Sequence, residues 1–264
     1  MINTIENHIK SIWKSFYTAP QNIIAESTKL ENYPLTRYLE MSGITILNSN
    51  LYDLSINYIS DNSEENIGFN KALFLKEGLL QMTKNLIPSQ RNYSSIVTPM
   101  FIKIFDSWTP EELKTMRIVI AGLRVNHPTR GTISIINNAC PSHWNEVGRP
   151  TKSIYMLQDI SHLMKDDNYW IKIWSDVSPE KTVIYHSNPD LYIKDDILTK
   201  REKELLKLIV KGKNPDEIAQ ELSISRVTVN NHRQKILNKL SVRDTTALIN
   251  LSKLIGFSLW GNES

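Results

Sequence analysis

Residues 224–240 read ISRVTVNNHRQKILNKL, and their apolar positions recur at the spacing of an amphipathic helix. Successive helical residues lie about 100° apart, so Val229, Ile236 and Leu240 share one narrow sector. Asn, Gln, Arg and Lys occupy the rest of the surface, and no acid interrupts them through residue 243. A helix that hides an aliphatic stripe and presents an acid-free polar face is suited to a partner with negative charge.

The residues around this stretch predict three further helices. Two helices come before it and one follows, each with its own boundary signals. These signals are Thr199 with Glu202 and Gly212 for the first, Asn214, Pro215 and Glu217 for the second, Ser225 for the third, and Asp244 with Gly256 for the fourth. Ser223, Ile224 and Ser225 make a tight turn before the basic helix. Two helices joined in this way form the helix-turn-helix arrangement that binds DNA.

The outward face of residues 224–240 predicts a role in reading bases. Val227, Asn231, Gln234 and Asn238 lie opposite the apolar stripe, with Asn230 and Lys235 at its flanks. Asn and Gln can pair bidentately with the N6 and N7 edge of adenine, so amides suit the major groove. Acids on this face would be repelled by phosphate, which explains their absence.

Residues 198–257 strongly resemble the C-terminal DNA-binding domain of the LuxR, or GerE, type. The resemblance is carried by LTKREKELLKLI, EIAQELSIS, TVNNHRQKILNKLSV and LINLSKLIGF. It implies that Asn230, Asn231 and Gln234 read bases and that the fourth helix makes a dimer contact. It also implies that Thr228, His232, Arg233 and Lys239 meet or flank phosphates. One departure is NPDEIA, where Asp216 replaces a lysine and leaves the phosphate contact of the second helix in doubt.

These arguments define one predicted DNA-binding set on the third helix. It comprises Arg226, Thr228, Asn230, Asn231, His232, Arg233, Gln234, Lys235, Asn238 and Lys239.

Composition and charge agree with a two-domain nucleic-acid-binding protein. The 264 residues are enough for two cores, and 41% hydrophobic with 22% charged residues is typical of a folded soluble protein. Residues 196–264 hold twelve Lys or Arg against eight Asp or Glu, whereas the preceding residues are nearly balanced. A single cysteine excludes an internal disulfide, and neither a signal peptide nor a membrane span is visible. A cytoplasmic location is expected.

The N-terminal half predicts an α+β domain. Ile9, Ile12 and Trp13 recur at helical spacing and predict a helix. Alternation of apolar and polar residues at 43–49 and 51–60, with many β-branched side chains, indicates two strands. Helical texture follows, including a capping box that opens at Thr109, and RIVIAGLRVN, TISIINNA and KSIYMLQDIS indicate three more strands. NYWIKIWS and KTVIYHS predict a further hairpin around SPE, and PSHWNEVGRP is a turn-rich connection.

This order of elements resembles a PAS domain from about Met41 to Leu163. INYISDNSEENIGF and SIYMLQDISHL carry the resemblance, which implies one antiparallel sheet with helices on one face. The predicted organisation is a PAS-like sensory or interaction domain with an N-terminal helical extension at 1–187, a polar linker at 188–197 and an all-α four-helix helix-turn-helix domain at 198–264.

Other kinds of site are less well supported by the sequence. Cys140, His143, His162 and His186 could form a metal set, but only the first two are closely spaced, so no metal site is predicted. No cofactor is identified, and flavin is disfavoured because Cys140 lies outside a flavin-adduct motif. Trp144, Tyr169, Trp170 and Trp174 are expected in a core or interface, and Asp166 with Asp167 in a turn. Receiver, lactone-binding and enzyme motifs are not found.

The sequence therefore predicts a transcription regulator that binds double-stranded DNA as a homodimer and acts indirectly on RNA polymerase. Its N-terminal domain would sense a small ligand or a protein partner, and the signal itself is not encoded in any motif. A second hypothesis keeps this fold but makes the protein an adaptor of the transcription machinery without a small ligand. A third, a promoter-reading region of a sigma factor, disagrees with the β-rich N-terminal half.

Overall fold

The structure, a computed structural model, describes residues 7, 9–14, 17, 34–191 and 196–255. In the N-terminal part the elements are α2 (Pro34–Met41), β1 (Thr45–Asn50), β2 (Ile56–Ile59), α3 (Ser63–Ile67), α4 (Lys71–Glu77), α5 (Gln81–Asn85), η2 (Pro88–Gln90), α6 (Tyr93–Ser107) and α7 (Pro110–Lys114). These are followed by β3 (Met116–His127), β4 (Gly131–Trp144), β5 (Pro150–Asp159), β6 (Trp170–Ser175), η3 (Pro179–Lys181) and β7 (Val183–His186). The C-terminal helices are α8 (Lys200–Val210), α9 (Pro215–Glu221), α10 (Arg226–Lys239) and α11 (Thr245–Ile255).

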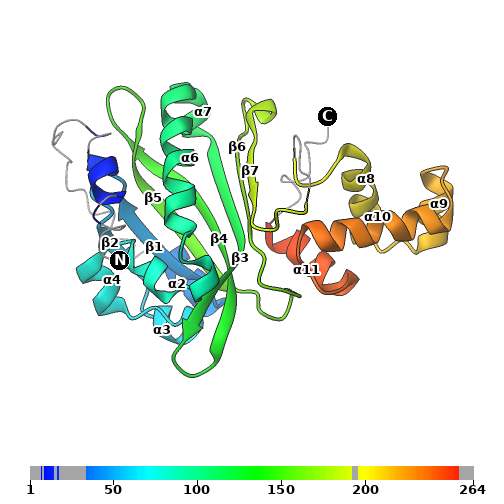
Figure 1. The fold of residues 1–264 in the computed structure, drawn as a ribbon, viewed down its shortest axis with the longest axis horizontal. Helices are drawn as coiled ribbons and strands as arrows, with labels where there is room; N and C mark the ends of the chain where they lie inside the picture. The colour runs from blue at the N-terminus through cyan, green and yellow to red at the C-terminus, as the bar shows by residue number, and fades with distance from the viewer. Residues whose placement is uncertain (1–6, 8, 15–16, 18–33, 192–195, 256–264) are drawn as a thin grey trace.

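The strands form one antiparallel sheet with seven strands, in the order β2-β1-β5-β4-β3-β6-β7. Every stretch predicted to be a strand from its alternating pattern contributes to this sheet. The PAS-like order of two strands, a run of helices and three strands is confirmed, and β6 and β7 extend the sheet beyond β3. Figure 1 shows helices of the N-terminal half on one face and α8 to α11 on the other.

Two connections differ in detail from the sequence predictions. The turn predicted at PSHWNEVGRP is shorter than expected, because β4 continues to Trp144 and β5 begins at Pro150. The cross-strand register shifts near His143, where the long hairpin bends. The SPE turn includes the short helix η3, which begins at Pro179.

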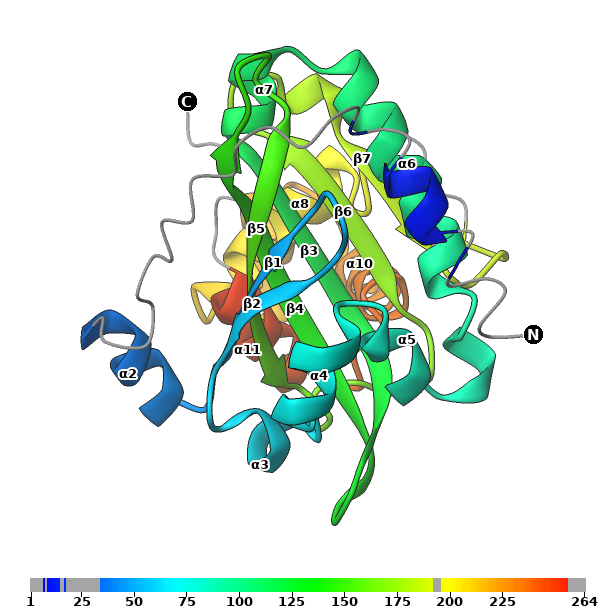
Figure 2. The same cartoon turned by 90° about the vertical axis from the view of Figure 1, so that its left-hand side faces the viewer.

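The inner face of the sheet packs against α3 to α7 and the N-terminal residues. Leu47, Ile118 and Ile135 lie on this face and are 5% exposed or less. Trp13 of the N-terminal segment also belongs to this cluster, and the centroid of its ring lies 6.1 Å from that of Phe105. Residues 9–14 are helical as predicted, whereas the expected end of this helix near Pro20 lies outside the described residues. Figure 2 shows the helices arranged over this side of the sheet.

The outer face of the sheet packs against the C-terminal helices. The outward side of β3, β4 and β6 contributes five apolar residues to one cluster with the helical domain: Val119, Ala121, Ile136, Trp170 and Trp174. Trp170 is fully buried in this cluster, and all six residues of β6 are buried. The second core is thus formed by residues of both the sheet and the C-terminal helices.

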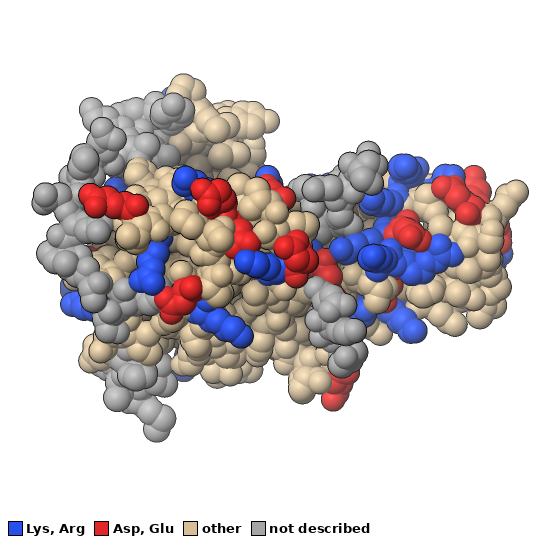
Figure 3. Space-filling model, turned by 90° about the horizontal axis from the view of Figure 1, so that it is seen from above, with Lys and Arg blue, Asp and Glu red and all other residues tan. Residues whose placement is uncertain are grey.

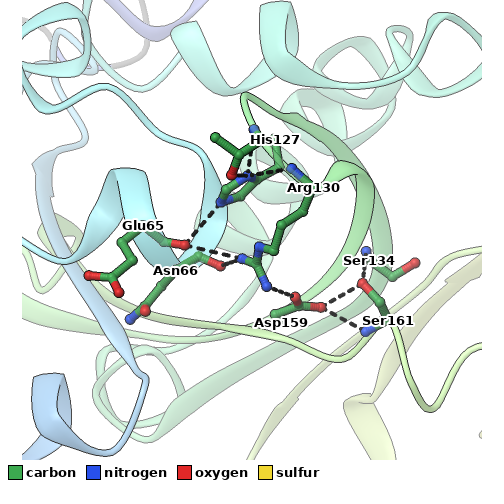
Figure 4. Close-up of polar contacts among 8 residues, drawn as sticks. Glu65, Asn66, His127, Arg130, Ser134, Asp159 and Ser161 are labelled. Carbon is green, nitrogen blue, oxygen red and sulfur yellow. Dashed lines mark hydrogen bonds and ion pairs between the residues drawn. The ribbon is translucent and has the colours of Figure 1, made fainter.

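A polar network fixes the turn between β3 and β4 (Figure 4). Arg130 Nη1 donates to Asp159 Oδ2 at 2.7 Å, and Arg130 Nη2 donates to the carbonyl oxygens of Glu65 and Asn66 in α3. His127 lies 3.0 Å from the Glu65 carbonyl through Nε2, while its Nδ1 accepts from backbone amides of the turn. The network therefore joins α3, the hairpin turn and the end of β5.

Candidate nucleic-acid interface and ligand cavity

The turn before α10 is built as its sequence predicts. The Ser225 hydroxyl accepts the amide of Thr228 at 3.1 Å, which caps the helix. Asn214 caps α9 in a complete capping box with Glu217, and Thr199 caps α8 with Glu202 in the same way. Each cap satisfies amides that would otherwise lack partners at a helix start.

The apolar stripe of α10 is buried as predicted. Val229 is 1% exposed, and Ile236 and Leu240 are fully buried. They pack in the same cluster as Leu206 of α8 and Ile218 of α9. This packing fixes the rotation of α10 about its axis and so decides which side chains face outward.

The centre of the opposite face carries amides and cations without internal partners. Asn231, Gln234 and Lys235 are exposed, and Asn230 and Arg233 are half-buried. Within the described part of the chain, the side chains of Asn230, Asn231, Arg233 and Lys235 form no hydrogen bond or ion pair. Figure 3 shows Lys and Arg gathered over the helical part of the molecule, with several Asp and Glu beside them. This arrangement leaves donors and positive charge available to an external polyanion.

The N-terminal end of this face contains an acid that the sequence pattern did not place there. Asp216 of α9 lies 3.2 Å from Arg226, and both side chains are about two thirds exposed. An exposed pair of this kind contributes little to stability, so Arg226 can leave it at small cost. Thr228 is also engaged, because its hydroxyl lies 2.8 Å from that of Ser225.

The C-terminal end of the face is engaged with the rest of the protein. Asn238 Oδ1 accepts from Lys165 Nζ at 2.7 Å and from Gln234 Nε2 at 3.2 Å. Lys239 Nζ pairs with Glu202 at 2.7 Å, with side chains only 15% and 3% exposed. His232 is half-buried, and its Nδ1 has no partner among the described residues. The role of Lys165 could not be found from sequence, since it lies on a distant loop.

A cavity of about 90 Å³ lies between the inner face of the sheet and the helices that cover it. Aromatic and aliphatic residues dominate its lining, including Trp13, Phe69 and Phe101. Burial raises the pKa of Tyr93 and Tyr155 in this wall, which keeps both phenols protonated. No charged side chain is among its described lining residues. The cavity offers an apolar environment with a few neutral polar groups.

The residues considered for a metal site serve other contacts or lie apart. No group of three or more His, Cys, Asp or Glu is arranged to hold a metal ion within residues that the structure describes. His186 faces the carbonyl of Lys239 at 3.2 Å through Nε2, and its Nδ1 accepts the Asn188 amide. Burial lowers the pKa of His186 below its ordinary value.

The aromatic residues and acids singled out in the sequence have structural contacts. Tyr169 and Trp174 are buried, as expected for a core or interface, and Trp144 is half-buried. Asp166 accepts the Asn168 amide in a turn, and Asp167 pairs with Arg124. In the described part of the chain, no helix is long and apolar enough to span a bilayer.

Comparison with known proteins places the helical part in a family of regulators. Residues 196–252 match the GerE family, described as bacterial regulatory proteins of the luxR family. The transcriptional regulatory protein DesR of Bacillus subtilis (strain 168) is 50% identical over 68 residues, which cover 26% of this chain and 34% of DesR. The spore germination protein GerE of the same organism is 49% identical over 47 residues, which cover 18% of this chain and 64% of GerE. The chain thus spans about a third to two thirds of these relatives.

Among solved structures, VqmA bound to DPO aligns over 84% of this chain and 86% of its own chain, at 18% identity and a TM-score of 0.31. The match of residues 196–252 to the GerE family model confirms the sequence resemblance for this segment.

Proposed function

We propose that this chain is a DNA-binding transcription regulator in which the outward face of α10 lies in the major groove. The observation that supports this is the set of unpartnered amides and cations at Asn230, Asn231, Arg233 and Lys235. Amides at the centre of the face suit base edges, and the cations around them suit phosphates. Because the apolar stripe is buried, no other face of α10 is free to bind.

Pairing of two chains would use the exposed side of α11. Ala247, Leu248 and Leu251 of this helix are buried inside the molecule. Thr246, Asn250, Lys253 and Leu254 are exposed and recur at helical spacing. A homodimer joined through this side would place two copies of α10 on half-sites about one helical turn of DNA apart.

The N-terminal domain would control this binding by taking up a small ligand. The cavity beneath the sheet supports a ligand sensor more than a ligand-free adaptor, because an adaptor needs a surface groove and no internal space. Native mass spectrometry of the purified full chain distinguishes the two. A retained small molecule is expected, and a co-purifying protein without any small molecule would support the adaptor instead.

The DNA-reading role is tested by comparing Asn231→Ala with Lys235→Ala on a selected DNA site and its single-base variants. Asn231→Ala should reduce discrimination at one base pair by about 1–3 kcal/mol, because it removes a base contact. Lys235→Ala should weaken all sequences by a similar factor and reduce the dependence of log K on log salt by about one. Fluorescence anisotropy at several salt concentrations measures both effects.

Lys76→Ala is the charge-matched control, since Lys76 is exposed on α4, on the opposite side of the sheet. It should leave both the affinity and the salt dependence unchanged. If Asn231→Ala weakens all DNA sequences equally and leaves discrimination intact, the base-reading role of this residue is wrong.

A further inference from the structure

One wall residue of the cavity differs in kind from its neighbours on the same strand. Ile133, Ile135, Asn137 and Ala139 alternate along β4, and this alternation places them on the inner face of the sheet. Asn137 is paired across the sheet with Ile120 on one side and Leu157 on the other. A carboxamide therefore lies in the middle of an otherwise aliphatic surface.

The oxygen of this carboxamide lacks a hydrogen-bond partner inside the protein. Asn137 is 2% exposed, and no donor in the described part of the chain reaches its Oδ1. Buried polar atoms are nearly always paired, so an unpaired one that lines a cavity calls for a partner within that cavity. The Tyr155 hydroxyl, which lines the same cavity, accepts a hydrogen bond from Ser49 at 3.2 Å.

The size and charge of the cavity restrict what that partner can be. An apolar cavity of about 150 Å³ holds benzene, so the 90 Å³ here suit a molecule no larger than one small ring. A net charge would be buried without a counter-ion, because the described lining is free of charged side chains. Apolar faces of a ring would contact Trp13 and Phe101, which lie in the same lining.

We propose that the cavity binds a small neutral cyclic molecule that donates an N–H or O–H hydrogen to Asn137 Oδ1. This proposal rests on the sensory role proposed for the N-terminal domain and defines the chemical class of its ligand. Selectivity would come from the donor, because a ring of the same shape without one leaves the Asn137 oxygen unpaired.

Pyrrole and furan test the proposal on the full chain, since both are small neutral rings of similar shape and only pyrrole carries an N–H. Ligand-observed NMR titrations give the two dissociation constants. Pyrrole should bind about fivefold to tenfold more tightly, the value of one hydrogen bond to a neutral acceptor. Equal affinity for the two rings, or binding of neither, would overturn the proposal.

Asn137→Leu and Asn138→Leu form a matched pair of variants. Asn138 is the next residue of β4 and borders the outer groove near α11 instead of the cavity. The preference for pyrrole should fall to about one in Asn137→Leu and persist in Asn138→Leu. A preference that survives in Asn137→Leu would contradict the assignment of the acceptor.

The comparison of pyrrole and furan on the unaltered chain decides the question even if Asn137→Leu does not fold. These titrations contain no DNA, so a negative result in them does not contradict the DNA-reading role of α10. A negative result in the DNA-binding experiments likewise does not contradict the proposed ligand class.

Discussion

Glu202 is a single residue that holds two helices. Its carboxylate accepts the Thr199 amide at 2.8 Å within the capping box of α8 and pairs with Lys239 of α10. Burial alone would raise the pKa of Glu202, but the hydrogen bonds from Lys239 and Thr199 outweigh it and hold that pKa below its ordinary value. Lys239, predicted from sequence to meet phosphate, is therefore also a structural partner.

Lys239→Met should lower the free energy of unfolding by about 3 kcal/mol, because it leaves the buried Glu202 carboxylate without its counter-ion. Lys235→Met is the control, since Lys235 is exposed without an internal partner, and it should change that free energy by less than about 0.5 kcal/mol. Urea denaturation at neutral pH measures both. Equal effects of the two substitutions would mean that the pair contributes nothing.

The same carboxylate gives a pH dependence of known sign. Because the folded pKa of Glu202 is lowered, its contribution is complete above pH 4.5 and is lost as the pH falls through the folded pKa. The difference in unfolding free energy between the unaltered chain and Glu202→Gln should therefore shrink as the pH falls below 4.5.

At the scale of an element, β3 bends at Gly122. The pairing with β4 shifts between Ala121 and Leu123, and Gly122 has a φ of +93°. A Cβ at this position would lie 2.4 Å from the carbonyl oxygen of Asn168. The bend therefore allows the loop after β5 to cross closely over the strand.

Gly122→Ala and Gly131→Ala separate backbone strain from this close approach. Gly131 has a φ of +72°, but nothing lies within 4 Å of a Cβ there. Gly131→Ala should lower the free energy of unfolding by about 1 kcal/mol, from the left-handed backbone alone. Gly122→Ala should lower it by about 2 kcal/mol more, because the loop backbone must move. Chemical denaturation measures the difference, and equal effects would show that the loop adapts freely.

The elements that the sequence predicted well are those decided by neighbouring residues. The caps at Thr109, Thr199, Asn214 and Ser225 are all present, since each depends on residues three positions away. The strands were also predicted, because their alternation is local. The bend at Gly122 was not, because an isolated glycine does not say which distant backbone will approach it.

At the scale of the whole molecule, the sheet and the helical domain share contacts that no local pattern predicts. Trp170 Nε1 donates to the Leu240 carbonyl at 3.3 Å. The Lys165 amide donates to Ser241 at 3.0 Å, and the Arg243 amide donates to Leu163 at 3.0 Å. The outward amides of α10 could be predicted from the helical periodicity. These hydrogen bonds could not, because they join residues that are far apart in the chain.

This shared core should make the described part of the chain unfold as one cooperative unit. Differential scanning calorimetry should show a single transition for the unaltered chain. Trp170→Ala should split it into two, because it removes a fully buried tryptophan of the outer cluster and its bond to Leu240. Trp13→Ala removes the same volume from the inner cluster and should lower the transition temperature without splitting it. Two transitions in the unaltered chain would contradict the coupling.

The attachment of α10 at its carboxyl end also bears on how the protein would measure DNA. A DNA-reading helix on a flexible linker can rotate to accept half-sites at several separations. One that is bonded to the sheet through Leu240 and to the loop after β5 through Asn238 cannot. In a paired assembly the distance between the two reading helices would then be set by the sheets that carry them. The N-terminal half, which contacts no base, would then determine which spacing between half-sites the protein accepts.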